Sequence, residues 1–444
     1  MLTFIPEPSL LDSARGRRWP AYPGPDRSTR VDTPPARPDV VIVGAGPAGL
    51  AVASALWHLG VHDIALLDRT GPPCRRFFDR IDGLEQRVLR SPYDHHPGVE
   101  GYHDCELLDF ARLHWNWLSP VERREIRMAQ AGHRSVVPVD VFEAFCHHVS
   151  TVHGVYQRTW HADVTGVVPD ADAVRVRTRG STLTARYVVL CLGEDRRPAP
   201  DSWWGDACHR PEHVTYWDEP VPAGAESVIV VGAGLTSAHL ITQALADGRT
   251  VHWVMRGEER YQCSDVNAAF FRAEGRARFD GVPWTDRLAT MGRERRASVM
   301  FEFRPALREA EADGRLMVHR GREIAGITGT GRGATLCFTD GATVSAEHVV
   351  LALGTRPTTG EHLLPAGLVN ATDGWADLDE RTLAYRGAPR VFAVGAAAGM
   401  VLGPAARNID GHRVATARVA ATIAGGLASV STVEEPGGDR GAGR

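Results

Sequence analysis

The sequence lacks the features of a disulfide-rich, membrane-spanning or nucleic-acid-binding protein. Its seven cysteines are scattered over 444 residues without a Cys-x-x-Cys motif, which argues against a disulfide framework and a sequence-local redox dithiol. The longest uncharged run, Val40 to His62, is broken by a Gly-Pro turn and is not expected to span a membrane. The net charge of -4 argues against a nucleic-acid partner. We expect a reduced, cytoplasmic protein without a secretory signal or a metal site.

One glycine-rich turn organises the N-terminal part of the sequence. An apolar, β-branched run at residues 40–43 precedes it, and an Ala/Leu-rich segment at residues 47–59 follows as an expected helix. The spacing G-x-G-x-x-G between a strand and a helix is typical of a dinucleotide-binding unit, in which the helix N-terminus faces the phosphates. A second apolar run then ends in an acid that can accept hydrogen bonds from ribose hydroxyls. The expected contacts of this first dinucleotide are Gly44, Gly46, Pro47, Ala48, Gly49 and Asp68.

A second glycine turn has similar surroundings. Apolar strands are expected at residues 227–231 and 250–254, with the turn and a helix between them. The third glycine of the motif is replaced by a serine, which is still small. The second strand is followed by an arginine instead of an acid, and an arginine there favours the 2′-phosphate of NADP; an ordinary surface role is the alternative. The expected contacts of this second dinucleotide are Gly232, Gly234, Leu235, Thr236, Ser237 and Arg256.

Each glycine turn is accompanied by an expected β-meander. The first covers residues 164–192 and the second residues 324–353, and each ends in an apolar run followed by glycine, Gly193 and Gly354. A further apolar run ends at Gly395. Because the same succession of elements occurs twice, we predict an α/β fold with two Rossmann-like dinucleotide-binding domains, each with a β-meander.

This succession resembles the two-dinucleotide flavoproteins over about residues 38–425. The resemblance implies FAD at the first unit and NAD(P)H at the inserted second unit. Gly395-Ala396 stands where the family usually has Gly-Asp, and Cys-x-x-Cys is absent; both features favour flavin monooxygenases over disulfide reductases. The domains so implied are a flexible arm (1–37), an FAD-binding domain in two parts (38–222 and 341–426), an NADPH-binding domain with a helical insertion (223–340) and a flexible tail (427–444).

Within the flavoproteins, the sequence is similar to class B monooxygenases and to their N-hydroxylating branch, which acts on ornithine and lysine. Residues 191–198 are similar to the Ala-Thr-Gly-x4-Pro element of the group. The segment 84–94 resembles a stretch of the N-hydroxylating branch in which Arg90 takes the place of the lysine that binds the substrate carboxylate. The segment 263–281 resembles another, which puts Asn267 at an amide that contacts substrate and nicotinamide. The resemblance also implies cofactor contacts at Arg69, Gln86, Gly193, Gly354, Gly395 and Leu402.

The activity that this resemblance implies is an FAD-dependent, NADPH-consuming monooxygenase. It would oxygenate a nucleophilic heteroatom, such as an amine nitrogen, through a C4a-hydroperoxyflavin, with molecular oxygen and a small amine or amino-acid-like substrate. One alternative is an FAD-dependent NAD(P)H reductase or oxidase without oxygen insertion. Another is a non-catalytic nucleotide-binding module that senses redox state. Glycine spacing does not distinguish the first two readings. A homo-oligomer is left open, and no nucleic-acid or membrane partner is expected.

Overall fold

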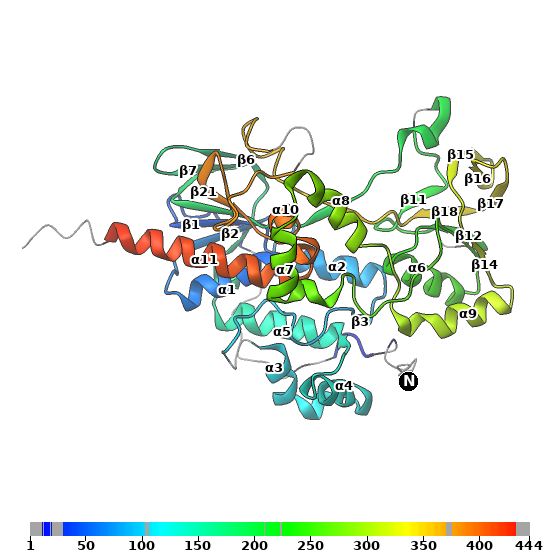
Figure 1. Ribbon diagram of the computed structural model, residues 1–444, viewed down its shortest axis with the longest axis horizontal. Helices are drawn as coiled ribbons and strands as arrows, with labels where there is room; N and C mark the ends of the chain where they lie inside the picture. Colours follow the sequence, from blue (N-terminus) through cyan, green and yellow to red (C-terminus); the bar gives the residue numbers. More distant parts are fainter. Residues whose placement is uncertain are drawn as a thin grey trace, which may run out of the picture.

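The computed structural model describes residues 11, 13–17, 19, 30–102, 106–207, 209–222, 224–369 and 375–431. In this part of the chain, strands gather into two sheets of mainly parallel strands that lie at opposite ends of the molecule in Figure 1. Between the two sheets in Figure 1, helices α7 (Ala273–Asp280) and α8 (Trp284–Glu294) pack against the short helix α10 (Gly399–Leu402). The architecture is therefore an α/β fold.

The first sheet carries the N-terminal glycine turn. Its strand order is β20 (Ala384–Tyr385), β21 (Ala388–Ala393), β9 (Tyr187–Leu190), β1 (Val40–Val43), β2 (Ile64–Asp68) and β5 (Thr159–His161). All neighbours except β20 and β21 are parallel. Strands β1 and β9 are buried along their whole length, which explains why both are continuous apolar runs. Helix α1 (Pro47–His58) packs between this sheet and helices α5 (Val139–Val152) and α11 (Ile409–Ser431).

The second sheet carries the second glycine turn. Its strand order is β11 (Val214–Tyr216), β18 (His348–Leu351), β12 (Ser227–Val231), β13 (Thr250–Val254) and β14 (Leu316–His319), all parallel. Helix α6 (Leu235–Ala246) packs on β12 and β13, and α9 (Arg304–Ala312) on β14. The predicted domain boundaries differ from this arrangement. The predicted FAD-binding parts include β11 and β18, yet β18 lies between β11 and β12 in this sheet, with all four of its residues buried.

Two small antiparallel sheets correspond to the predicted meanders. The first contains β6 (Val164–Pro169), β7 (Val174–Thr178) and β8 (Thr182–Ala185). The second contains β15 (Ile324–Thr330), β16 (Gly333–Phe338) and β17 (Thr343–Ala346). The last apolar run of each predicted meander leaves the antiparallel sheet and becomes a central parallel strand, β9 or β18.

A two-stranded ribbon joins the two halves of the molecule. Strand β10 (Glu194–Arg196) follows β9 on the way into the second sheet, and β19 (Thr355–Pro357) follows β18 on the way back. The two strands pair antiparallel, Glu194 opposite Pro357 and Arg196 opposite Thr355. Both crossings therefore run side by side.

Three helices follow in the chain between β2 and α5. They are α2 (Arg75–Gly83), α3 (Leu107–Leu113) and α4 (Pro120–Gln130), and the short strand pair β3 (Val88–Leu89) and β4 (Val137–Pro138) lies in the same stretch of chain. Within the described ranges, no helix is long and apolar enough to cross a membrane.

Part of the predicted flexible N-terminal arm is docked on α4 and α5. Arg17 forms ion pairs with Glu122 and Asp140, whose side chains are only 2% and 4% exposed. Trp19 donates its indole N–H to Asp140 over 2.8 Å, and Arg15 pairs with Glu143. Buried carboxylates need cationic partners, which accounts for the docking of Arg15 and Arg17, and the flexibility of residues 1–37 stays a prediction. Residues 427–431 of the predicted flexible tail continue α11.

Candidate functional site

A cavity of about 480 Å³ opens where the parallel strands of the first sheet end. Ligands of open α/β sheets bind at this edge, beyond the carboxyl ends of the strands. Residues from both glycine turns, both meander ends and the late strand end line it together. The predicted contacts among the lining residues are Gly44, Gly46, Pro47, Ala48, Asp68, Arg69, Gln86, Gly193, Thr236, Gly354 and Gly395.

The first glycine turn has a steric reason for each glycine. Gly44 has φ of +99°, and a Cβ there would lie 2.3 Å from the carbonyl oxygen of Cys191 on the neighbouring strand. A Cβ on Gly49 would lie 2.0 Å from the carbonyl oxygen of Gly44, so helix and strand could not approach as closely. At Gly46 nothing lies within 4 Å of the Cβ position. This open side of the turn, at the N-terminus of α1, leaves room for a phosphate.

Asp68 lines the cavity and also ties the glycine turn together. One carboxylate oxygen accepts the backbone N–H of Ala45 over 2.7 Å. The other accepts the backbone N–H and the hydroxyl of Thr70 over 2.7 and 2.6 Å. A carboxylate offers about four lone-pair sites, so these bonds leave room for a ribose hydroxyl.

The second glycine turn repeats the steric plan of the first. Gly232 has φ of +137°, and a Cβ there would lie 2.2 Å from the carbonyl oxygen of Ala352. The Cβ position of Gly234 is open, as at Gly46. Of the six residues predicted for this unit, however, only Thr236 reaches the cavity. Arg256 is exposed just beyond β13.

A set of charged residues that the sequence analysis missed lines the cavity beside Gly193. Glu194 pairs with Arg407 and accepts the hydroxyl of Thr355 over 2.6 Å, while Arg76 pairs with Asp195 over 2.8 Å. Burial would raise the pKa of Glu194, but the guanidinium of Arg407 and the hydroxyl of Thr355 outweigh it and hold the pKa below its usual value. The only sequence signal for this set was the run of charged residues directly after Gly193.

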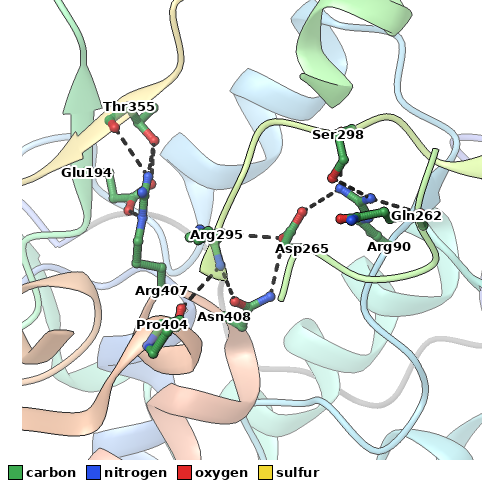
Figure 2. Close-up of polar contacts among 10 residues, drawn as sticks. All are labelled: Arg90, Glu194, Gln262, Asp265, Arg295, Ser298, Thr355, Pro404, Arg407 and Asn408. Atoms are coloured by element: carbon green, nitrogen blue, oxygen red, sulfur yellow. Dashed lines mark hydrogen bonds and ion pairs between the residues drawn. The ribbon is translucent and has the colours of Figure 1, made fainter. Parts of the chain in front are cut away.

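Arg90 occupies a place different from the expected one. Its side chain is 7% exposed and does not line the cavity. The guanidinium pairs with Asp265 over 2.6 Å, donates to both the carbonyl oxygen and hydroxyl of Ser298, and donates to the carbonyl oxygen of Gln262 over 2.8 Å (Figure 2). Both terminal nitrogens are thus bound by the protein. The expected role, a fork open to a substrate carboxylate, does not fit this geometry.

Asp265 connects Arg90 to the C-terminal part of the chain. Its other carboxylate oxygen accepts from Arg295 and from the amide of Asn408, both over 3.3 Å, and Arg295 also donates to Asn408 (Figure 2). Burial would raise the pKa of Asp265, but Arg295 and Arg90 outweigh it and keep the pKa low. The carboxylate therefore stays charged and fastens the 260–300 segment to the first half of the molecule.

Two other predicted residues also lie off the cavity. Asn267 is exposed, and its side-chain oxygen accepts the backbone N–H of Ala269 over 3.0 Å, which caps a 3₁₀ turn (Ala268–Phe271). Leu402 is buried in the hydrophobic core. Neither position shows a free group aimed at the cavity, so their predicted contacts remain predictions.

Solved structures with the same fold cover nearly the whole chain. The reduced ornithine hydroxylase PvdA from Pseudomonas aeruginosa is 15% identical, with a TM-score of 0.70 over 88% of this chain and 99% of that one. The cadaverine monooxygenase DfoA from Erwinia amylovora, bound to FAD, is 16% identical, with a TM-score of 0.68 over 89% and 95%. The ornithine N-hydroxylase KtzI from Kutzneria sp. 744, with reduced FAD, NADP⁺ and L-ornithine, is 16% identical, with a TM-score of 0.66 over 87% and 99%.

A family match in sequence extends over more than half of the chain. No curated protein matches the chain significantly. Residues 38–282, which contain both glycine turns, match the family described as pyridine nucleotide-disulphide oxidoreductase. The chain belongs to this family, and it is an oxidoreductase that uses FAD and NAD(P).

Proposed function

We propose that the chain is an FAD-dependent, NADPH-consuming monooxygenase that oxygenates the nitrogen of a small amine. The observation that carries this proposal is the cavity that the first glycine turn and Thr236 of the second line together, because it brings both nucleotide units to one site. The three solved structures support it, since they are an ornithine hydroxylase, an ornithine N-hydroxylase and a cadaverine monooxygenase.

The first glycine turn fits the pyrophosphate of FAD. The open side of Gly46 and the N-terminus of α1 provide space and backbone N–H groups for it, and Asp68 offers an acceptor for ribose. When bound, FAD supplies the redox and oxygen chemistry. The protein binds and orients the reactants and excludes water from the cavity.

The second glycine turn is proposed to hold NADPH. The Cβ position of Gly234 is open, as it is at Gly46, and Thr236 in the first turn of α6 lines the shared cavity. Arg256, exposed after β13, is proposed to bind the 2′-phosphate. A diffusible reductant fits this more open position.

The proposed substrate is an amine whose binding does not depend on a substrate carboxylate at Arg90. The terminal nitrogens of that guanidinium are fully engaged with Asp265, Ser298 and Gln262. A substrate carboxylate could bind there only by displacing a buried ion pair, which is costly. A diamine or monoamine therefore fits the site better than an α-amino acid bound in the expected way.

Product analysis tests the proposal. Purified protein with bound FAD is mixed with NADPH, oxygen and a panel of ornithine, lysine, cadaverine and simple alkylamines. We expect one amine to accelerate NADPH oxidation and to yield a hydroxylamine in nearly equal amount to the NADPH consumed. Hydrogen peroxide equal to NADPH with every amine would instead support a reductase or oxidase. Failure to retain FAD would support the non-catalytic module.

A further inference from the structure

His412 is a cavity-lining residue that neither glycine turn accounts for. It lies near the start of α11, the helix that packs against α1 (Figure 1). A Cβ built on Gly395 would lie 3.5 Å from Nε2 of His412 and 3.8 Å from Cβ of Ala48. The imidazole edge therefore faces the end of β21, where Ala48 in the first turn of α1 also lies close to Gly395.

The protein leaves this imidazole unsatisfied. Nδ1 of His412 is buried and has no hydrogen-bond partner among the described residues. Burial lowers the pKa of His412 to about 4, so the ring is neutral near pH 7 and carries one N–H donor. Since no protein group fixes the tautomer through Nδ1, the proton is free to sit on Nε2. A proton on Nε2 places the one N–H donor of the ring at the nitrogen nearest to Gly395.

The loop after β21 offers no polar side chain of its own. Gly395 is followed by Ala396, Ala397 and Ala398, all buried. A ligand oxygen that reaches this end of the cavity consequently finds no side-chain donor in the loop. His412 is the donor that α11 places across from it.

We propose that His412 is an FAD-binding residue that donates a hydrogen bond from Nε2 to an oxygen in the ribityl–pyrophosphate part of the cofactor. The position beside Gly395 and Ala48 favours this part of FAD over the adenine, because the α1 N-terminus is where a phosphate binds. The proposal rests on FAD binding, which the family supports, and not on oxygen insertion.

His239 provides a matched control. It is 6% exposed, burial lowers its pKa to about 4 as for His412, and one of its ring nitrogens, Nε2, has no partner among the described residues. It lies on α6, packs edge-on against Phe303 with ring centroids 4.8 Å apart, and does not line the cavity. The two histidines thus share a pKa lowered by burial and differ in access to the cavity.

The test measures release of FAD from the holoenzyme on dilution, by flavin fluorescence, without NADPH or amine. We expect the FAD dissociation constant to rise at least tenfold in His412→Leu, to stay within about threefold in His412→Gln, which keeps a donor, and to be unchanged in His239→Leu. A His412→Leu holoenzyme that holds FAD within twofold of the parent would overturn the proposal. So would an equal loss in His239→Leu, which would indicate a general packing effect.

A measurement on the unsubstituted protein covers the case in which His412→Leu does not fold. Histidine ¹⁵N shifts are compared before and after FAD is added to the stripped protein. We expect one buried histidine to change its shifts, and that signal to be missing in His412→Gln. If no signal assigned to His412 moves, His412 does not contact FAD. Because neither measurement involves oxygen, its result is independent of whether the enzyme is a monooxygenase.

Discussion

The two glycine turns share a steric plan but differ in their surroundings. In each turn, a side chain on the first glycine would strike a carbonyl oxygen of the adjacent central strand, Cys191 beside Gly44 and Ala352 beside Gly232. The common plan reflects what a tight strand-to-helix turn demands of the backbone in either sheet. It does not by itself say how firmly a ligand is held.

The difference lies in what encloses each turn. The first turn lines the cavity and is tied down by Asp68, whereas the second contributes only Thr236 and is followed by the exposed Arg256. An enclosed turn with an acid suits a cofactor that stays bound, and an open turn with a cation suits a phosphorylated reductant that exchanges. The same backbone device can thus serve permanent and transient ligands.

Substitution of the first glycine should produce the largest contrast. Gly44→Ala combines a positive φ with a clash against Cys191, so we expect a loss of about 3 kcal/mol or more in unfolding free energy and protein without FAD. Gly234→Ala, at an open position with φ of -99°, should keep both stability and FAD and weaken NADPH alone. Thermal unfolding measures the stability of each variant, and flavin absorbance measures its FAD content. Equal effects of Gly44→Ala and Gly234→Ala on both quantities would contradict the proposed difference between the two turns.

Removal of the acid should act on FAD only. In Asp68→Ala, the N–H groups of Ala45 and Thr70 lose their acceptor, and we expect FAD affinity to fall about 10- to 100-fold. The KM for NADPH, measured at saturating FAD, should be unchanged. A rise in that KM as large as the loss of FAD affinity would contradict the assignment of separate roles to the two turns.

Arg90 tests the connection between the two regions. Arg90→Lys keeps the charge but cannot reproduce the bonds to Asp265, Ser298 and Gln262, so we expect a loss of about 1–3 kcal/mol in stability and little change in the KM for the amine. Denaturant unfolding and steady-state kinetics measure the two quantities. A KM raised 100-fold at unchanged stability would restore the direct substrate role.

Arg256 tests the open turn. Arg256→Ser should lower the ratio of kcat/KM for NADPH to that for NADH about tenfold and leave FAD content unchanged. Arg315→Ser, another exposed arginine near the second sheet, is the control and should leave the ratio as it is. An unchanged ratio in Arg256→Ser would show that Arg256 is an ordinary surface residue.

The smallest effect concerns acid stability beside the enclosed turn. The folded pKa of Glu194 is lowered, so its pairing with Arg407 stabilises the fold above its unfolded pKa of about 4.3 and is lost as the pH falls through the folded pKa. We expect Glu194→Gln to lower Tm at pH 7 and to differ less from the parent as the pH falls below about 4. A difference that grows with acidification would have the wrong sign.

The sequence analysis found those features that depend on neighbouring residues. The glycines follow from the sterics of a strand–turn–helix unit, which is why Gly44, Gly46 and Gly49 were identified. Likewise, the long apolar runs identified the central strands. Strand β18 was misplaced because a buried parallel strand does not record which sheet it joins.

Features that depend on distant partners were not predictable. Arg90 binds Asp265, which lies 175 positions away in the chain, and no local sequence pattern indicates that the guanidinium is already hydrogen-bonded by the protein. The contacts of Arg17 were not predictable either, since nothing near it in sequence indicates that Glu122 and Asp140 are buried and need a cation. Arg76, Arg407 and His412, which line the cavity, were missed for the same reason.

The paired crossings β10 and β19 have a mechanical consequence. Because the two connections are hydrogen-bonded to each other, neither sheet can swing about a single covalent tether. Any relative movement of the halves therefore has to bend or twist both strands of the ribbon together. Glu194, Arg407 and Thr355 sit at its base and stiffen it (Figure 2). The ribbon thus couples the movements of the two nucleotide units.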